Sequence, residues 1–86
     1  MAVMATVREH LRQMIAEIGE IDNAAVITDQ ADLYDELGLD SMQCLEIVLE
    51  IESRFGISVP EDSLQQIRSL ADALRISSEL GAKDDA

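Results

Sequence analysis

The sequence predicts an all-α fold, a four-helix bundle with three longer helices and one short helix. Three segments place apolar residues at the spacing of one helix face. The 86 residues include only one proline and four glycines, so few helix breakers are present. Almost half of the residues are apolar but only Tyr34 and Phe55 are aromatic, which indicates a core of aliphatic side chains. This length fits one domain, residues 1–86, with its core at about 6–80 and a flexible tail at 82–86.

The first helix is expected over residues 6–18. Its apolar side chains fall at i, i+4, i+7, i+8 and i+11, and they are Val7, Leu11, Met14, Ile15 and Ile18. Gly19 is expected to end the helix. His10 lies outside the apolar stripe and has no second metal ligand nearby in the sequence, so we expect a solvated histidine.

Residues 20–36 have no sustained periodicity and predict a long connection, with a candidate helical turn near residues 32–37. Single apolar residues are expected to hold this connection on the core: Ile21, Val26, Ile27 and Leu33. Long ordered loops in small domains often contribute to function.

The second helix is expected to begin at Ser41. Asp40 is a good N-cap, and Gln43 can complete a capping box. Two neighbouring apolar rows follow at helical spacing. The first row is Cys44, Ile47, Val48, Ile51 and Phe55, and the second row is Met42, Leu45 and Leu49. The second row either completes a broad buried face or forms an apolar edge beside Ser41; we predict an interior lined by both rows, with Cys44 as a small buried hydrophobe.

The remaining elements follow from glycine, proline and serine positions. Gly56 is expected to end the second helix, and residues 57–60 form an extended link. Pro60 should open the short helix, which runs through Ile67. Ser69 is the expected cap of the last helix, which ends at Gly81 and whose apolar residues are Leu70, Ala73, Leu74 and Leu80.

The charge of −12 comes from eighteen acidic residues against six lysines and arginines. Such a surface repels nucleic acid and anionic lipid and favours basic protein partners, although acidity also simply confers solubility. No apolar run is long enough for a signal sequence or a membrane span, and one cysteine cannot form an internal disulfide. These features predict a cytoplasmic monomer without membrane insertion.

Ser41 has no evident means of acting as a nucleophile by itself. A serine nucleophile needs a base within hydrogen-bond reach, and His10 is expected on another helix. The sequence also lacks a glycine-rich phosphate loop, a cysteine and histidine metal set, and a nucleophile elbow. We therefore predict no enzyme activity and no metal. The start of a helix does stabilise an attached phosphate, so Ser41 could accept a phosphate-linked group from another enzyme.

The block DLYDELGLDSMQCLEIVLEIESRFGISVPED resembles the central region of acyl carrier proteins. The Leu-Gly-x-Asp-Ser lead-in, the Asp-Ser-Met attachment motif, the acidic helix with a Phe-Gly stop and the Ile-x-Val-Pro-Glu-Asp segment carry the resemblance, which spans about residues 6–80. It implies that a phosphopantetheinyl transferase attaches the 4′-phosphopantetheine of coenzyme A to Ser41. The thiol of that arm would carry cargo as a thioester, and Asp40 would cap the helix and help the transferase recognise it.

The resemblance also implies that the second helix docks basic patches of partner enzymes. These would be the transferase, an acyl- or aminoacyl-loading ligase or transferase, and downstream synthases of fatty-acid, polyketide or specialised biosynthesis. The candidate docking residues are Met42, Leu45, Glu46, Leu49, Glu50 and Glu52. Gln43 stands where fatty-acid carriers commonly have aspartate, and Ser53 and Arg54 interrupt the usual acidic run, which favours a specialised carrier.

Three alternatives remain open from the sequence. The chain could be a stand-alone aminoacyl or peptidyl carrier. It could instead be an acidic helical interaction module that is phosphorylated at Ser41. An enzyme that depends on His10 or Cys44 is the third alternative.

Overall fold

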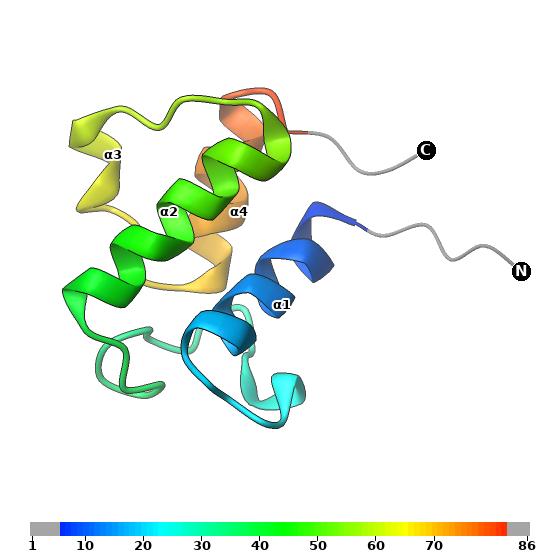
Figure 1. Cartoon of the computed structure of the whole chain (residues 1–86), viewed down its shortest axis with the longest axis vertical. Coiled ribbons are helices and arrows are strands. Elements are labelled where there is room, and N and C mark those ends of the chain that lie inside the picture. The colour runs from blue at the N-terminus through cyan, green and yellow to red at the C-terminus, as the bar shows by residue number, and fades with distance from the viewer. Residues whose placement is uncertain (1–5, 83–86) are drawn as a thin grey trace, which may run out of the picture.

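The computed structural model describes residues 6–82 and consists of helices and connecting turns. The helices are α1 (Val7–Ile18), α2 (Ser41–Phe55), α3 (Glu61–Leu64) and α4 (Leu70–Glu79), with the 3₁₀ turn η1 (Ala24–Val26) between the first two (Figure 1). The prediction of an all-α bundle with three longer helices and one short helix is confirmed. The predicted tail, apart from Ala82, lies outside the described residues.

The core lies where α1 faces both α2 and α4. In Figure 1, α4 lies behind α2 and α1 runs beside them. The largest side chains with less than 2% of their surface exposed come from all three long helices and from the connection between α1 and α2. The helices contribute Leu11, Ile15, Ile47, Ile51, Leu70 and Ser77, and the connection contributes Ile27 and Leu33. None of the helices within residues 6–82 is long and apolar enough to cross a membrane.

Helix α1 ends at Ile18 as predicted, but the residue that takes the left-handed conformation after it is Glu20 and not Gly19. Gly19 has an ordinary right-handed conformation with φ −82°. Glu20 instead takes the left-handed conformation, φ 54°, and the Ile21 N–H donates to the Ala16 carbonyl oxygen at 2.8 Å, as in a Schellman motif. Gly19 is needed for space, because a Cβ there would lie 2.9 Å from the carbonyl oxygen one turn earlier and 3.1 Å from Leu39 Cδ1.

The connection between α1 and α2 is ordered by backbone hydrogen bonds. The Glu36 and Leu37 N–H groups both donate to the Asp32 carbonyl oxygen at 3.0 Å, so a hydrogen-bonded turn forms where a helical turn was expected. Ile27 and Leu33 are buried as predicted. Val26 is 52% exposed, so its predicted role in the core is wrong; it lies on η1, which the sequence analysis missed.

The two apolar rows of α2 have different environments. In the first row Cys44, Ile47, Val48 and Ile51 are buried and Phe55 is half-buried. The second row is exposed, with Met42 at 66%, Leu45 at 41% and Leu49 at 55%. The prediction that both rows line the interior is therefore wrong. The four residues of α3 are too few to cover both rows of a fifteen-residue helix.

The last two helices start close to the predicted residues. Pro60 precedes α3, which ends at Leu64 rather than at Ile67, and Ile67 is buried in the turn that follows. The Ser69 side chain accepts the Asp72 N–H at the start of α4, as expected for an N-cap.

His10 is not simply solvated, and that prediction was wrong. Its ring is half-buried and packs edge-on against Phe55, with centroids 5.9 Å apart at an interplanar angle of 79°. Arg54 Nη1 lies 3.3 Å from its Nδ1. His10 therefore joins α1 to the final turn of α2, a contact between distant segments that helical spacing cannot predict.

Candidate functional site

The start of α2 carries a complete capping box. The Gln43 N–H donates to Asp40 Oδ1 at 2.8 Å, and the Asp40 N–H donates to Gln43 Oε1 at 2.9 Å. The Cys44 N–H donates to the Asp40 carbonyl oxygen at 3.0 Å. The cap predicted at Asp40 is thus observed, and it fixes the residue where the helix begins.

Gln43 has a second contact that the sequence did not reveal. Its Nε2 donates to the Ile18 carbonyl oxygen at 3.2 Å, so the start of α2 is tied to the last residue of α1. An aspartate at this position would be shorter and could not donate a hydrogen bond. The glutamine that departs from the usual family residue therefore has an internal structural role.

Ser41 is the first residue of α2 and is exposed. Once the capping bonds are formed, the N–H groups of Ser41 and Met42 have no protein partner among residues 6–82. They lie at the positive end of the helix, which favours a negatively charged group. An attached phosphate at Ser41 therefore fits the local charge and hydrogen-bonding capacity.

A pocket of about 240 Å³ lies beside Ser41. Residues of α2, residues in and after α3 and one residue of the α1–α2 connection line it: Tyr34, Ser41, Cys44, Leu45, Val48, Leu64, Gln65 and Ile67. Cys44 is only 8% exposed, as expected for a small buried hydrophobe, and burial raises the pKa of its thiol. Ser41 is thus close to both solvent and a sheltered, mainly apolar space.

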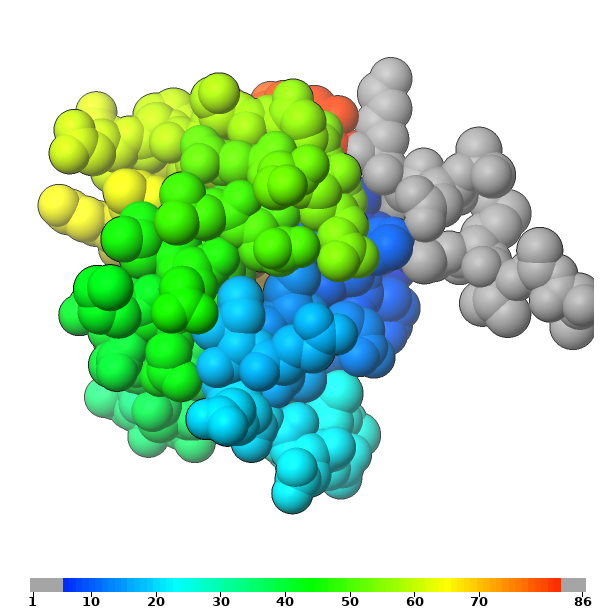
Figure 2. All heavy atoms as spheres, viewed as in Figure 1, coloured from blue at the N-terminus to red at the C-terminus, as the bar shows by residue number. Residues whose placement is uncertain are grey.

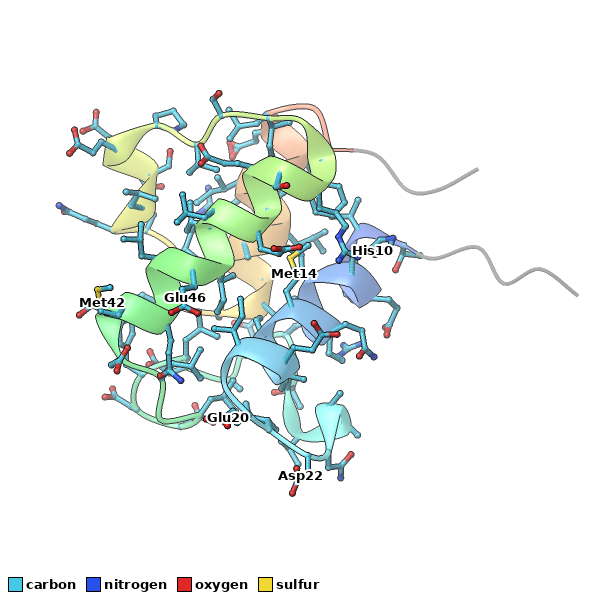
Figure 3. The ribbon with its side chains drawn as sticks, in the orientation of Figure 1. His10, Met14, Glu20, Asp22, Met42 and Glu46 are labelled. Atoms are coloured by element: carbon cyan, nitrogen blue, oxygen red, sulfur yellow. The ribbon has the colours of Figure 1, made fainter. Side chains whose placement is uncertain are left out.

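The outer face of α2 presents apolar and acidic side chains beside Ser41. Helix α2 (green) lies along the face of the molecule shown in Figure 2, and Met42 and Glu46 project outward from it in Figure 3. We call the exposed second row, Met42, Leu45 and Leu49, together with Glu46 the α2 outer face.

The other two candidate docking acids have partners within the chain. Glu50 lies 3.5 Å from Arg54 in an i,i+4 ion pair. Glu52 accepts the Val59 N–H at 2.8 Å and is half-buried, so it holds the segment after α2. Of the three candidate docking glutamates, Glu46 is exposed to solvent, whereas Glu50 and Glu52 are half-buried.

Within residues 6–82, the histidine lies far from Ser41. His10, the one histidine of the chain, contacts Phe55 at the far end of α2, which lies roughly 21 Å along the helix axis from Ser41 at 1.5 Å per residue. His10 is therefore too far from Ser41 to take the proton of its hydroxyl.

Comparison with known proteins bears directly on this site. Residues 9–76 match the family described as "Phosphopantetheine attachment site". A protein of Mycobacterium tuberculosis described as an acyl carrier protein superimposes with a TM-score of 0.77 and 26% identity over 84% of this chain and 95% of that one.

Two further structures are similar. The hexanoyl acyl carrier protein of the actinorhodin polyketide synthase from Streptomyces coelicolor gives a TM-score of 0.69 and 29% identity, covering 93% of this chain and 94% of that one. The acyl carrier protein of Enterococcus faecalis gives 0.67 and 28%, covering 86% and 98%.

Proposed function

The chain belongs to the acyl carrier protein family, whose members carry covalently attached 4′-phosphopantetheine, and we propose that Ser41 is the residue that carries it. The attached group supplies a thiol that holds cargo as a thioester. The family works as a carrier for other enzymes, so the protein needs to present one accessible serine rather than a catalytic centre.

The exposed position of Ser41 at the capped start of α2 is the observation that supports this proposal most strongly. Asp40 and Gln43 fix the first turn, and the N–H groups of Ser41 and Met42 favour a phosphate there. The distance from His10 supports a division of labour in which the transferase removes the proton from the Ser41 hydroxyl.

Partner enzymes dock on the α2 outer face in this account. Exposed apolar residues flanked by a carboxylate suit an apolar patch bordered by basic side chains, and the net charge of −12 steers such partners toward the carrier. Gln43 is uncharged and bonded to the Ile18 carbonyl oxygen, and Glu50 is paired with Arg54. Helix α2 therefore offers a partner fewer unpaired carboxylates than a uniformly acidic helix does. This difference favours partners of a specialised acyl pathway.

Incubation with coenzyme A and a broad-specificity phosphopantetheinyl transferase, followed by intact mass measurement, tests the proposal. We expect a single phosphopantetheine adduct on the wild-type chain and none on Ser41→Ala. Ser53→Ala is the matched control, because it removes an exposed hydroxyl from the same helix and should still be loaded.

Loading of Ser41→Ala, or no loading of the wild-type chain by several transferases that modify a known carrier, would contradict attachment at Ser41. A phosphate adduct at Ser41 after incubation with kinases, in a chain that no transferase modifies, would favour the interaction module. Incubating the loaded chain separately with acyl- and aminoacyl-ligases distinguishes an acyl carrier from an aminoacyl carrier by the mass of the thioester formed.

A further inference from the structure

We propose that Met42 is a redox-sensitive modification site. Hydrogen peroxide oxidises its thioether to a sulfoxide, which weakens the docking of partner enzymes on the α2 outer face, and reduction of the sulfoxide restores docking. The inference rests on the docking proposed for that face and adds a means of regulating it. It depends on where the sulfur atoms of the chain lie and on which of them is exposed beside Ser41.

Met42 carries the accessible sulfur atom of residues 6–82. Its side chain is 66% exposed, whereas the other two sulfur-containing residues of this range, Met14 and Cys44, are only 3% and 8% exposed. In Figure 3, Met42 projects outward from the start of α2, whereas Met14 lies between α1 and α2. Because oxidation of a side chain requires access to it, peroxide reaches Met42 before Met14.

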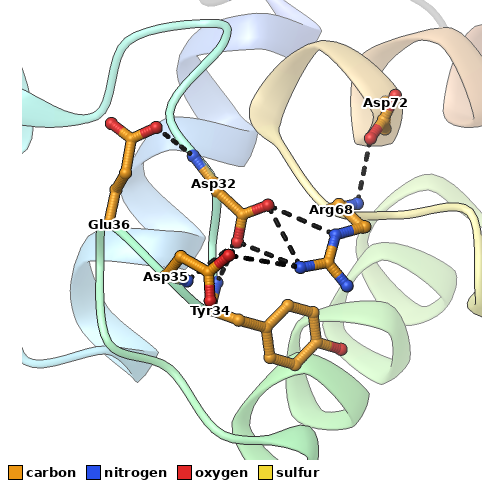
Figure 4. A network of polar contacts seen from close by, with 6 residues as sticks. All are labelled: Asp32, Tyr34, Asp35, Glu36, Arg68 and Asp72. Atoms are coloured by element: carbon orange, nitrogen blue, oxygen red, sulfur yellow. Dashed lines mark hydrogen bonds and ion pairs between the residues drawn. The ribbon is translucent and has the colours of Figure 1, made fainter.

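Cys44 is protected from peroxide, although it lines the pocket beside Ser41. Burial raises the pKa of its thiol, and the thiolate is the form that reacts. Tyr34 lines the same pocket and is held by a network of ion pairs and hydrogen bonds (Figure 4). The Arg68 guanidinium lies 4.8 Å from the centroid of the Tyr34 ring, and Asp32 accepts the Tyr34 N–H at 2.9 Å. This fixed wall limits access to the thiol.

Oxidation changes the polarity of Met42. The sulfur attacks one oxygen of hydrogen peroxide, an S–O bond forms, and the O–O bond breaks; the sulfur loses two electrons, and the leaving hydroxide takes the proton from the transferred oxygen and becomes water. A sulfoxide is polar, so burying it against an apolar surface of a partner costs free energy unless it gains a hydrogen bond. Leu45 and Leu49, the other apolar residues of the α2 outer face, have no sulfur to oxidise.

The position of Met42 makes this change matter for docking. Met42 follows Ser41 directly and is the most exposed of the three apolar residues of the α2 outer face, so an enzyme that reaches the Ser41 hydroxyl comes close to it. Because most of the side chain lies in solvent, its sulfoxide stays hydrated in the free chain and the fold is retained. Oxidation of the buried Met14 would instead disrupt the core.

Treatment of the unloaded chain with hydrogen peroxide tests the inference, because the oxidisable thiol of the attached arm is then absent. After catalase removes the peroxide, fragmentation mass spectrometry should locate an added oxygen at Met42. The KM of the phosphopantetheinyl transferase for the oxidised chain should rise about tenfold, which corresponds to about 1.4 kcal/mol of docking free energy. The kcat should change less than about twofold. Methionine sulfoxide reductases for both epimers, with a dithiol that becomes a disulfide, should restore the KM.

Met42→Leu is the matched control, because it keeps an apolar side chain without a thioether. Peroxide should leave its KM unchanged, although Met1 and Met4, which lie outside the described residues, remain in this variant. Met42→Gln replaces the thioether by a polar group of similar length and should raise the KM about tenfold without peroxide. The urea midpoints of the oxidised and untreated chains should coincide, since the fold is retained.

An unchanged KM after Met42 has been oxidised, or an equal rise in the KM of peroxide-treated Met42→Leu, would overturn the inference. Oxidation of Met14 or Cys44 while Met42 stays intact would also overturn it, as would a KM of Met42→Gln equal to that of the wild-type chain. Failure of the transferase to load the untreated chain would instead contradict attachment at Ser41, so the two failures are distinguishable.

Discussion

Replacing Gln43 by alanine tests whether the start of α2 is held to α1 through this side chain. The substitution removes two hydrogen bonds, from the exposed Asp40 N–H at 2.9 Å and to the partly buried Ile18 carbonyl oxygen at 3.2 Å. We assign about 0.5 kcal/mol to the exposed bond and about 1 kcal/mol to the partly buried one. Alanine returns a few tenths of a kcal/mol through its helix propensity. The expected net loss of unfolding free energy is about 1 kcal/mol.

Urea unfolding followed by circular dichroism measures this loss. With a slope of about 1 kcal/mol per molar urea, the midpoint should fall by about 1 M. Gln13→Ala is the matched control, because Gln13 is exposed on α1 and alanine brings it the same gain in propensity. Its unfolding free energy should change by less than about 0.5 kcal/mol. A Gln43→Ala midpoint as high as that of Gln13→Ala would refute the proposed link between the helices.

Three further predictions concern single side chains. Glu20→Gly should stabilise the protein by about 0.5–1 kcal/mol and raise its Tm, because glycine adopts the left-handed φ of 54° without a Cβ penalty; a lower Tm would count against this. Hydrogen bonds from the Asp35 and Tyr34 backbones, with Arg68, lower the pKa of Asp32 below 3.8, so its contribution to stability is present above that pH and lost as the pH falls through the folded value. Urea midpoints from about pH 5 to about pH 3 should therefore fall less steeply for Asp32→Asn than for the wild-type chain, and parallel curves would contradict the shift. Glu46→Lys should raise the KM of the transferase for the carrier several-fold at low salt and less above about 0.15 M, whereas an effect independent of salt would remove Glu46 from the docking face.

Local patterns predicted the parts of the fold that local interactions determine. Helical spacing located α1, α2 and α4, and the side chains of Asp40 and Ser69 identified two helix starts because capping acts within four residues. The same logic placed Ser41 in the first turn of α2. Spacing also separated the two apolar rows of that helix.

Contacts between distant segments could not be read from those patterns. Whether the second row of α2 is buried depends on which segments pack against it, and spacing along one helix does not show this. The sequence also suggested a short helix through Ile67, whereas the structure ends α3 at Leu64. His10 meets Phe55 only because α1 packs along α2. Tyr34 lies on a connection and Cys44 on a helix, so their shared place in the wall of the pocket beside Ser41 became visible only in three dimensions.

The most direct test of the account is to locate the attached group on the loaded wild-type chain by fragmentation mass spectrometry. The account predicts that fragments containing Ser41 carry the phosphopantetheine and that fragments cut on either side of that residue bracket the added mass. An adduct on any other serine, or on Cys44, would contradict the claim that the exposed hydroxyl at the start of α2 is the attachment point.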